Sequence, residues 1–111
     1  MTKITFYKKK DGGGYVGFEV NGHSGFGPAG EDVVCSALSA LIINCVNSID
    51  ALTEEKMDVE ATEDEAHIKV SFDDVPGKEA VLLIRSLALG LTNIEAMEGA
   101  SEYISVNYEE V

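Results

Sequence analysis

The sequence predicts an α+β domain of two layers, in which a mostly antiparallel sheet carries two helices on one face. Three observations predict this fold. Short alternating segments occur in pairs joined by glycine-rich or polar turns, which is typical of β-hairpins. Two longer segments repeat apolar residues every three or four positions, as amphipathic helices do. The segment order is β-β-α-β-β-α-β, and a chain of 111 residues has room for one such core, so we expect a single domain over residues 1–111.

Alternation of apolar and polar residues defines the predicted strands. They span residues 2–9, 15–21, 57–61, 66–72 and 103–108. In the first hairpin, Ile4 and Phe6 alternate with polar residues, and the connecting residues 11–14 include three glycines. Glycine supplies the positive φ angles of a tight turn. The second strand of this hairpin leads directly to His23.

Apolar periodicity defines two helices, expected over residues 31–52 and 78–98. The apolar positions of the first are Val34, Leu38, Leu41, Ile42, Cys45, Ile49 and Leu52. Those of the second are Val81, Leu82, Ile84, Leu87, Ala88, Leu91, Ile94 and Met97. Gly90 lies inside the second helix, where glycine often permits two helices to approach closely. The longest apolar run, residues 37–45, is broken by Ser39 and Asn44 and is expected to be too short to span a bilayer.

The composition restricts the classes of partner. There are 20 acidic and 8 basic residues, a formal net charge of −12, which disfavours direct binding to nucleic acid or to an anionic membrane surface. The acidity would attract a basic partner, or it serves solubility alone. The chain starts without a signal-peptide pattern. Cys35 and Cys45 lie about 15 Å apart on one predicted helix, beyond disulfide reach, which suits a reducing cytoplasm.

The segment from residue 22 to residue 39 carries the chemistry. A histidine, His23, ends a strand, a glycine-dense loop follows, and Cys35 lies where the first helix is expected to begin. At a helix start, unpaired N–H groups and the positive end of the dipole favour the thiolate, although the carboxylates of Glu31 and Asp32 oppose it. His23 is placed to take the thiol proton as a general base. This pairing predicts cysteine catalysis.

The remaining residues of this segment have supporting roles with alternatives. The loop between Gly25 and Gly30 offers backbone N–H groups for an oxyanion. Asp32 is either the N-cap of the first helix or an orienter of His23. Ser39, one turn after Cys35, bonds His23, a substrate carbonyl or its own helix.

Two other side chains are assigned structural or solvent roles. Cys45 is expected to fill the core among apolar neighbours, and His67 is expected to be solvated beside Glu65 and Lys69. A zinc site from the two cysteines and two histidines has no suitable ligand spacing, so no metal or cofactor is expected.

The same segment closely resembles the signature of the ribosomal-processing cysteine protease family, Prp. The matching residues are Gly22, His23, Gly25, Gly30, Asp32, Cys35, Ala37 and Ser39. The resemblance implies a cysteine endopeptidase with a Cys35–His23 dyad that removes the N-terminal extension of a ribosomal large-subunit protein. It further implies a homodimer and a cleavage site with apolar or aromatic residues before the cut, which a groove near Phe26 would suit.

Two other functions are compatible with the sequence. One is a non-enzymatic, ribosome-associated module that binds peptides in a groove shaped by the same motif. The other is a thiol-redox protein using Cys35, although Cys45 is too distant to act as its resolving cysteine.

Overall fold

The computed structural model describes residues 2–10, 12, 14–22, 29–62, 67–73 and 75–111, apart from the side chains of residues 29–32. The elements of this part of the chain follow in order. They are β1 (Thr2–Lys8), β2 (Tyr15–Asn21), α1 (Ala29–Leu52), β3 (Met57–Thr62), β4 (His67–Phe72), α2 (Lys78–Glu95), the short 3-10 helix η1 (Ala100–Glu102) and β5 (Ile104–Glu110). The predicted β-β-α-β-β-α-β order is confirmed.

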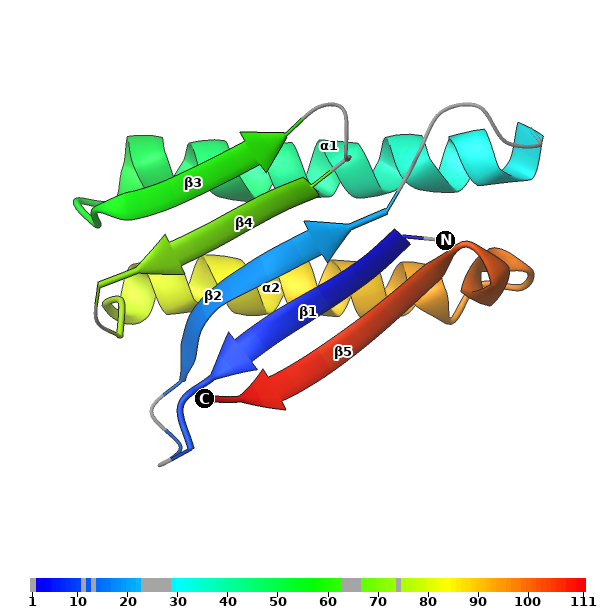
Figure 1. The fold of residues 1–111 in the computed structure, drawn as a ribbon. Coiled ribbons are helices and arrows are strands. Elements are labelled where there is room, and N and C mark those ends of the chain that lie inside the picture. Colours follow the sequence, from blue (N-terminus) through cyan, green and yellow to red (C-terminus); the bar gives the residue numbers. More distant parts are fainter. Residues whose placement is uncertain (1, 11, 13, 23–28, 63–66, 74) are drawn as a thin grey trace.

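The strands form one sheet in the order β3-β4-β2-β1-β5. The pairs β1–β2, β2–β4 and β3–β4 are antiparallel, whereas β1 and β5 are parallel. Both helices lie on the same face of this sheet, with α1 toward the β3 edge and α2 behind the central strands (Figure 1). The two-layer α+β fold is therefore confirmed, with one parallel pair in an otherwise antiparallel sheet.

Glycines allow two local features of the first hairpin. Gly12 and Gly14 have φ angles of 79° and 93°, as the predicted turn requires. Gly17, within β2, has a φ of 156°, and a Cβ atom there would lie 2.4 Å from the carbonyl oxygen of Val70 on β4. Only glycine lets β2 and β4 pair this closely.

The core lies between the sheet and the two helices. Phe6 and Phe18 from the sheet are fully buried, as are Ile49 of α1 and Leu91 of α2. A Cβ atom at Gly90 of α2 would lie 3.2 Å from the side chain of Leu41 on α1. The expected close approach of the helices at this glycine is confirmed.

Two helix ends differ from those expected. α1 begins at Ala29, two residues earlier than predicted, and α2 ends at Glu95, three residues earlier. The chain leaves α2 through a turn in which Gly99 has a φ of 82°, before η1. The predicted C-terminal limit of α1, Leu52, is confirmed. The apolar periodicity overran only the end of α2, where Met97 is 62% exposed. Leu82, also expected on the buried stripe, faces outward.

Much of α1 is apolar enough to be compared with a membrane span. Val33–Leu52 has the length and the mean hydropathy, 1.6, of a helix that could cross a bilayer, contrary to the expectation from the shorter apolar run over residues 37–45. One stripe of this helix packs on the sheet. Its buried members are Cys35, Leu38, Ile42, Cys45 and Ile49. Their spacing is that of a helix covering a protein core.

Candidate active site

A cavity of about 220 Å³ lies at the end of the sheet, beside α1. It is lined by Thr2, Val20, Gly22, Cys35, Leu38, Ser39, Ile42, Ile43, Ala61, Thr62, His67 and Ile68. Half of these residues are aliphatic, and the others include a thiol, an imidazole and three hydroxyls. Such a lining suits the apolar part of a ligand, held by few polar groups.

Cys35 brings a nucleophile to the wall of this cavity. It lies on the buried stripe of α1 and is only 3% exposed. It forms no disulfide with Cys45. The cavity gives a bound group access to Cys35 from one side, while core packing holds the helix from the other. The predicted nucleophile and a ligand-sized cavity therefore occur together.

The position of Cys35 within α1 corrects the expectation that it begins the helix. Because α1 starts at Ala29, Cys35 is its seventh residue and belongs to the second turn. The backbone N–H groups without intrahelical partners belong to the first four residues, 29–32. The helix terminus is therefore more remote from the thiol than the sequence suggested, and it contributes less to forming a thiolate.

Gly22 connects β2 to the signature segment. It follows Asn21, the last residue of β2, has a φ of 117° and lines the cavity. This φ favours glycine, which explains a glycine immediately before His23. His23, Gly25 and Phe26 lie outside the described residues, so their predicted roles stay predictions.

The other signature residues lie on α1. Gly30 and Asp32 are both within its first turn, so Asp32 is not the N-cap residue, which must precede the helix. The expectation of a cap at Asp32 was wrong because the helix extends further back than its apolar pattern. Ser39, one turn after Cys35, is exposed and lines the cavity. The structure thus brings Gly22, Cys35 and Ser39 to one cavity.

Thr2 is a cavity residue that the sequence did not single out. Its backbone N–H donates to the carbonyl oxygen of Tyr103 at 2.8 Å, which fixes the start of β1. Its side chain is buried, and its Oγ1 has no hydrogen-bond partner among the described residues. A buried hydroxyl without a partner is unusual, because desolvation costs free energy that no bond returns. The hydroxyl of Thr2 is therefore a candidate hydrogen-bonding group for a ligand in the cavity.

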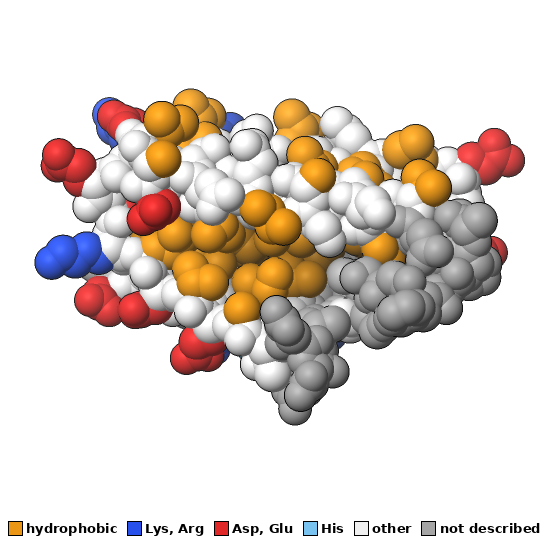
Figure 2. All heavy atoms as spheres, turned by 90° about the horizontal axis from the view of Figure 1, so that it is seen from above, with side chains coloured by type: hydrophobic (Ala, Val, Ile, Leu, Met, Phe, Trp, Pro, Cys, Tyr) orange, Lys and Arg blue, Asp and Glu red, His pale blue; other side chains and the backbone are white. Residues whose placement is uncertain are grey.

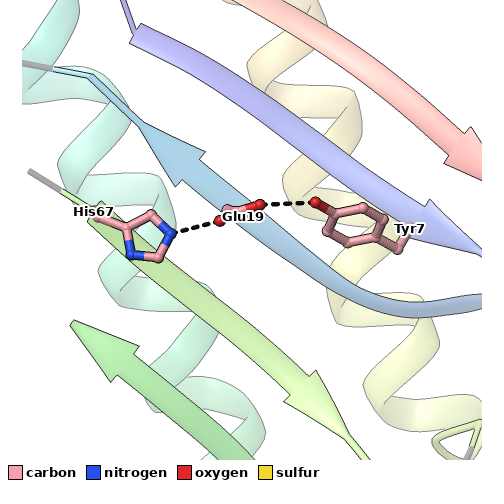
Figure 3. A network of polar contacts seen from close by, with 3 residues as sticks. All are labelled: Tyr7, Glu19 and His67. Atoms are coloured by element: carbon pink, nitrogen blue, oxygen red, sulfur yellow. Dashed lines mark hydrogen bonds and ion pairs between the residues drawn. The ribbon is translucent and has the colours of Figure 1, made fainter.

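His67 is not solvated as expected. Its Nε2 pairs with Glu19 Oε2 at 2.5 Å, and the hydroxyl of Tyr7 donates to Glu19 Oε1 at 2.7 Å. The three side chains form a row across β4, β2 and β1, in front of the sheet and away from the helices (Figure 3). His67 is also among the residues that line the cavity. The prediction failed because the partner lies 48 residues away in sequence.

This row shifts the titration of two of its members. The bonds from His67 and Tyr7 lower the pKa of Glu19, since both stabilise its carboxylate. The same carboxylate, with burial, raises the pKa of Tyr7 to about 12, because an ionised phenol could no longer donate. Glu19 is therefore an anion that ties three strands together near the cavity end of the sheet.

Cys45 is a core residue, as expected. It is buried, its Sγ donates to the carbonyl oxygen of Leu83 at 3.6 Å, and burial raises its pKa to about 11. A thiol with this pKa is a poor nucleophile at neutral pH. Among the described residues, no three His, Cys, Asp or Glu side chains gather in a way that could hold a metal ion.

Comparison with known proteins agrees with this site. The family model described as cysteine protease Prp matches residues 1–105. A ribosomal processing cysteine protease Prp of Staphylococcus aureus is 32% identical over 90 residues, which cover 81% of this chain and 83% of that protein. Two structures of the S. aureus protease, one with a substrate peptide and one with a covalently linked product peptide, superpose with TM-scores of 0.87 and 0.85. Both are 28% identical, and each match covers 98% of this chain and 100% of the other.

The fold, the cavity with its cysteine and these matches together define the class of protein as a cysteine protease. Within that class, the chain belongs to the Prp family.

Proposed function

We propose that this chain is a cysteine endopeptidase with a Cys35–His23 dyad, which removes the N-terminal extension of a ribosomal large-subunit protein. The observation that carries the proposal is the position of Cys35 on the wall of a largely apolar cavity, in a chain of the Prp family. A related S. aureus protein is named a ribosomal processing protease, and its structures hold peptides.

The proposed reaction has two stages. His23 takes the proton of the Cys35 thiol, and the sulfur attacks the scissile carbonyl carbon to give a tetrahedral oxyanion. The carbon–nitrogen bond then breaks, His23 returns the proton to the leaving amine, and a thioester to Cys35 remains. Water, losing a proton to His23, attacks the thioester. The carbon–sulfur bond then breaks, and the extension leaves with a new carboxyl end. The sulfur of Cys35 takes back the proton from His23.

The other signature residues take supporting roles in this proposal. Backbone N–H groups between Gly25 and Gly30 stabilise the oxyanion, and Asp32 orients His23. Ser39 lies within one helical turn of Cys35 on the cavity wall, which supports contact with His23 or a substrate carbonyl. Gly22 supports the dyad by allowing the chain to turn at a φ of 117° immediately before His23. Phe26 contributes to the groove for apolar substrate residues.

Charge supports the nature of the substrate. Ribosomal proteins are basic because they bind RNA, and a chain with a formal net charge of −12 attracts them at long range. We assign the reaction to the cytoplasm, in keeping with a reduced Cys35. A homodimer is also proposed, and the exposed Leu82 and Leu89 on the outer side of α2 support it. Sedimentation of the wild-type chain beside a Leu82→Lys/Leu89→Lys variant tests that contact.

The experiment is cleavage of the full-length ribosomal protein precursor by the wild-type chain, Cys35→Ala and His23→Ala, with the product N-terminus read by mass spectrometry. Cys45→Ala is the matched control, because it removes the other thiol of the same helix. We expect one defined cut by wild type and control, and none by the other two. Binding of the precursor without a cut by the wild type would favour a peptide-binding module instead.

A further inference from the structure

The outer edge strand of the sheet has an uncovered apolar face. β3 pairs with β4 on one side, and no described segment pairs with its other side. On the helix-side face of β3, Val59 is 45% exposed and Ala61 is also exposed. Figure 2, which views this edge, shows hydrophobic side chains gathered in a hollow between α1 and β3. An exposed strand edge beside an apolar hollow is a template for an added strand.

This hollow continues from the cavity that contains Cys35. Ile43 of α1 and Ala61 of β3 line that cavity. Val59 lies two residues before Ala61 on the same face of β3, so the apolar surface extends along the strand away from the thiol. A chain that enters the cavity in an extended conformation can therefore continue along the edge of β3.

The opposite face of β3 is acidic. Asp58 and Glu60 alternate with Val59 and Ala61, and both residues are exposed. Glu60 is opposite Lys69 of β4, whereas Asp58 is opposite the uncharged Ser71, so Asp58 carries most of the attraction for a basic residue. If a second copy of the chain added its own β3 antiparallel, the two sets of carboxylates would face each other, which is unfavourable. A strand with basic residues at these positions would instead complement them. The charge pattern thus favours a basic peptide over self-association at this edge.

We propose that an extended segment of the substrate adds to β3 as a sixth strand of the sheet. Its apolar residues enter the hollow between α1 and β3, and its alternate residues are basic and face Asp58 and Glu60. The proposal deepens the proposed function and rests on it. Asp58 lies three residues from Ala61, about 10 Å along the strand, so only a peptide extending that far beyond the cavity contacts it.

The binding test uses the Cys35→Ala chain and a synthetic peptide with the cleavage junction flanked on both sides by alternating valine and lysine. Amide hydrogen exchange of residues 57–62 is measured with and without peptide. We expect these amides to gain protection with the lysine peptide. Absence of protection, or equal protection by a version with glutamate in place of lysine, overturns the proposal. So does protection that grows with protein concentration alone, since a second copy would then occupy the edge.

The kinetic test compares Asp58→Lys with Glu109→Lys, the same charge reversal on β5 at the opposite edge of the sheet. Asp58 is opposite Ser71, so the new lysine meets no like charge across the pair. We expect kcat/KM for the long lysine peptide to fall about fivefold in Asp58→Lys only, and less at high salt. A short peptide that ends at the cavity should be cleaved equally by both variants. Equal rates on the long peptide contradict the proposal.

The two tests separate this inference from the proposed function. Cleavage of the short peptide without protection of β3 refutes the added strand and leaves the protease intact. Protection of β3 without cleavage of either peptide by the wild type supports the added strand and refutes the endopeptidase.

Discussion

The row Tyr7–Glu19–His67 gives the sharpest test of how the sheet is held near the cavity. The perturbation is a double-mutant cycle of Tyr7→Phe and Glu19→Gln, which removes the phenol–carboxylate bond while keeping both side-chain shapes. This bond is 2.7 Å long and has a charged acceptor. It therefore belongs to the stronger hydrogen bonds of proteins.

The magnitude follows from the charge and exposure of Glu19. A hydrogen bond to a charged group contributes about 1.5–3 kcal/mol when well buried. Glu19 is 21% exposed, and water partly replaces a lost partner, so the lower end applies. We expect Tyr7→Phe to cost about 1.5 kcal/mol and the coupling energy in the cycle to be about 1 kcal/mol.

The assay is urea unfolding of the wild type, the two single variants and the double variant. Unfolding is monitored by circular dichroism at several pH values. Because folding lowers the pKa of Glu19, its stabilisation is present above the unfolded-state value near 4.5 and is lost as pH falls through the folded-state value. Folding raises the pKa of Tyr7, so its stabilisation is complete below pH 10 and is lost as pH rises through about 12. A coupling energy indistinguishable from zero at pH 7, or one that persists in acid, would refute the reasoning.

Three further outcomes are expected. Gly17→Ala should cost at least about 2 kcal/mol in urea unfolding, because its Cβ would lie 2.4 Å from the carbonyl oxygen of Val70; a change below about 0.5 kcal/mol would contradict this account. Thr2→Val should leave the protein equally stable or up to about 1 kcal/mol more stable, since it removes a buried hydroxyl that has no partner among the described residues. A lower kcat/KM at unchanged stability would show that the hydroxyl contacts substrate. Iodoacetamide at pH 8 should label Cys35 and spare Cys45, whose pKa is raised to about 11, as peptide mapping can establish; labelling of Cys45 in the folded chain would be the opposing result.

The sequence predicted those parts of the fold that depend on local patterns. Alternation located the strands, and the glycines at 12 and 14 marked the turn of the first hairpin. Local patterns could not predict the parallel pairing of β1 with β5, because this pairing joins strands at the two ends of the chain. Two helix limits were less accurate: α1 begins two residues before its apolar pattern, and that of α2 continues past its end to the exposed Met97.

The predicted nucleophile, Cys35, lies on the wall of the cavity, and its role stays a prediction; the surroundings of this residue were predicted less well. Cys35 was found from its place after a glycine-rich segment, although the argument from the helix start weakened once α1 proved to begin at Ala29. His67 and Thr2 were missed because their neighbours in the cavity come from distant segments. One signal was available for His67: it alternates with the apolar, partly buried Ile68, as Glu19 does with Val20, which places both polar side chains on one face of the sheet.

The central claim is that Cys35 attacks the scissile carbonyl of a peptide bound in the cavity. The most direct test is to replace the scissile bond of the substrate peptide by a chloromethyl ketone and to measure the mass of the labelled chain. The account predicts one adduct per chain, located on Cys35, with peptidase activity falling in proportion to labelling and no adduct in Cys35→Ala. Full labelling of Cys35 with activity retained, or inactivation through an adduct elsewhere, would contradict it.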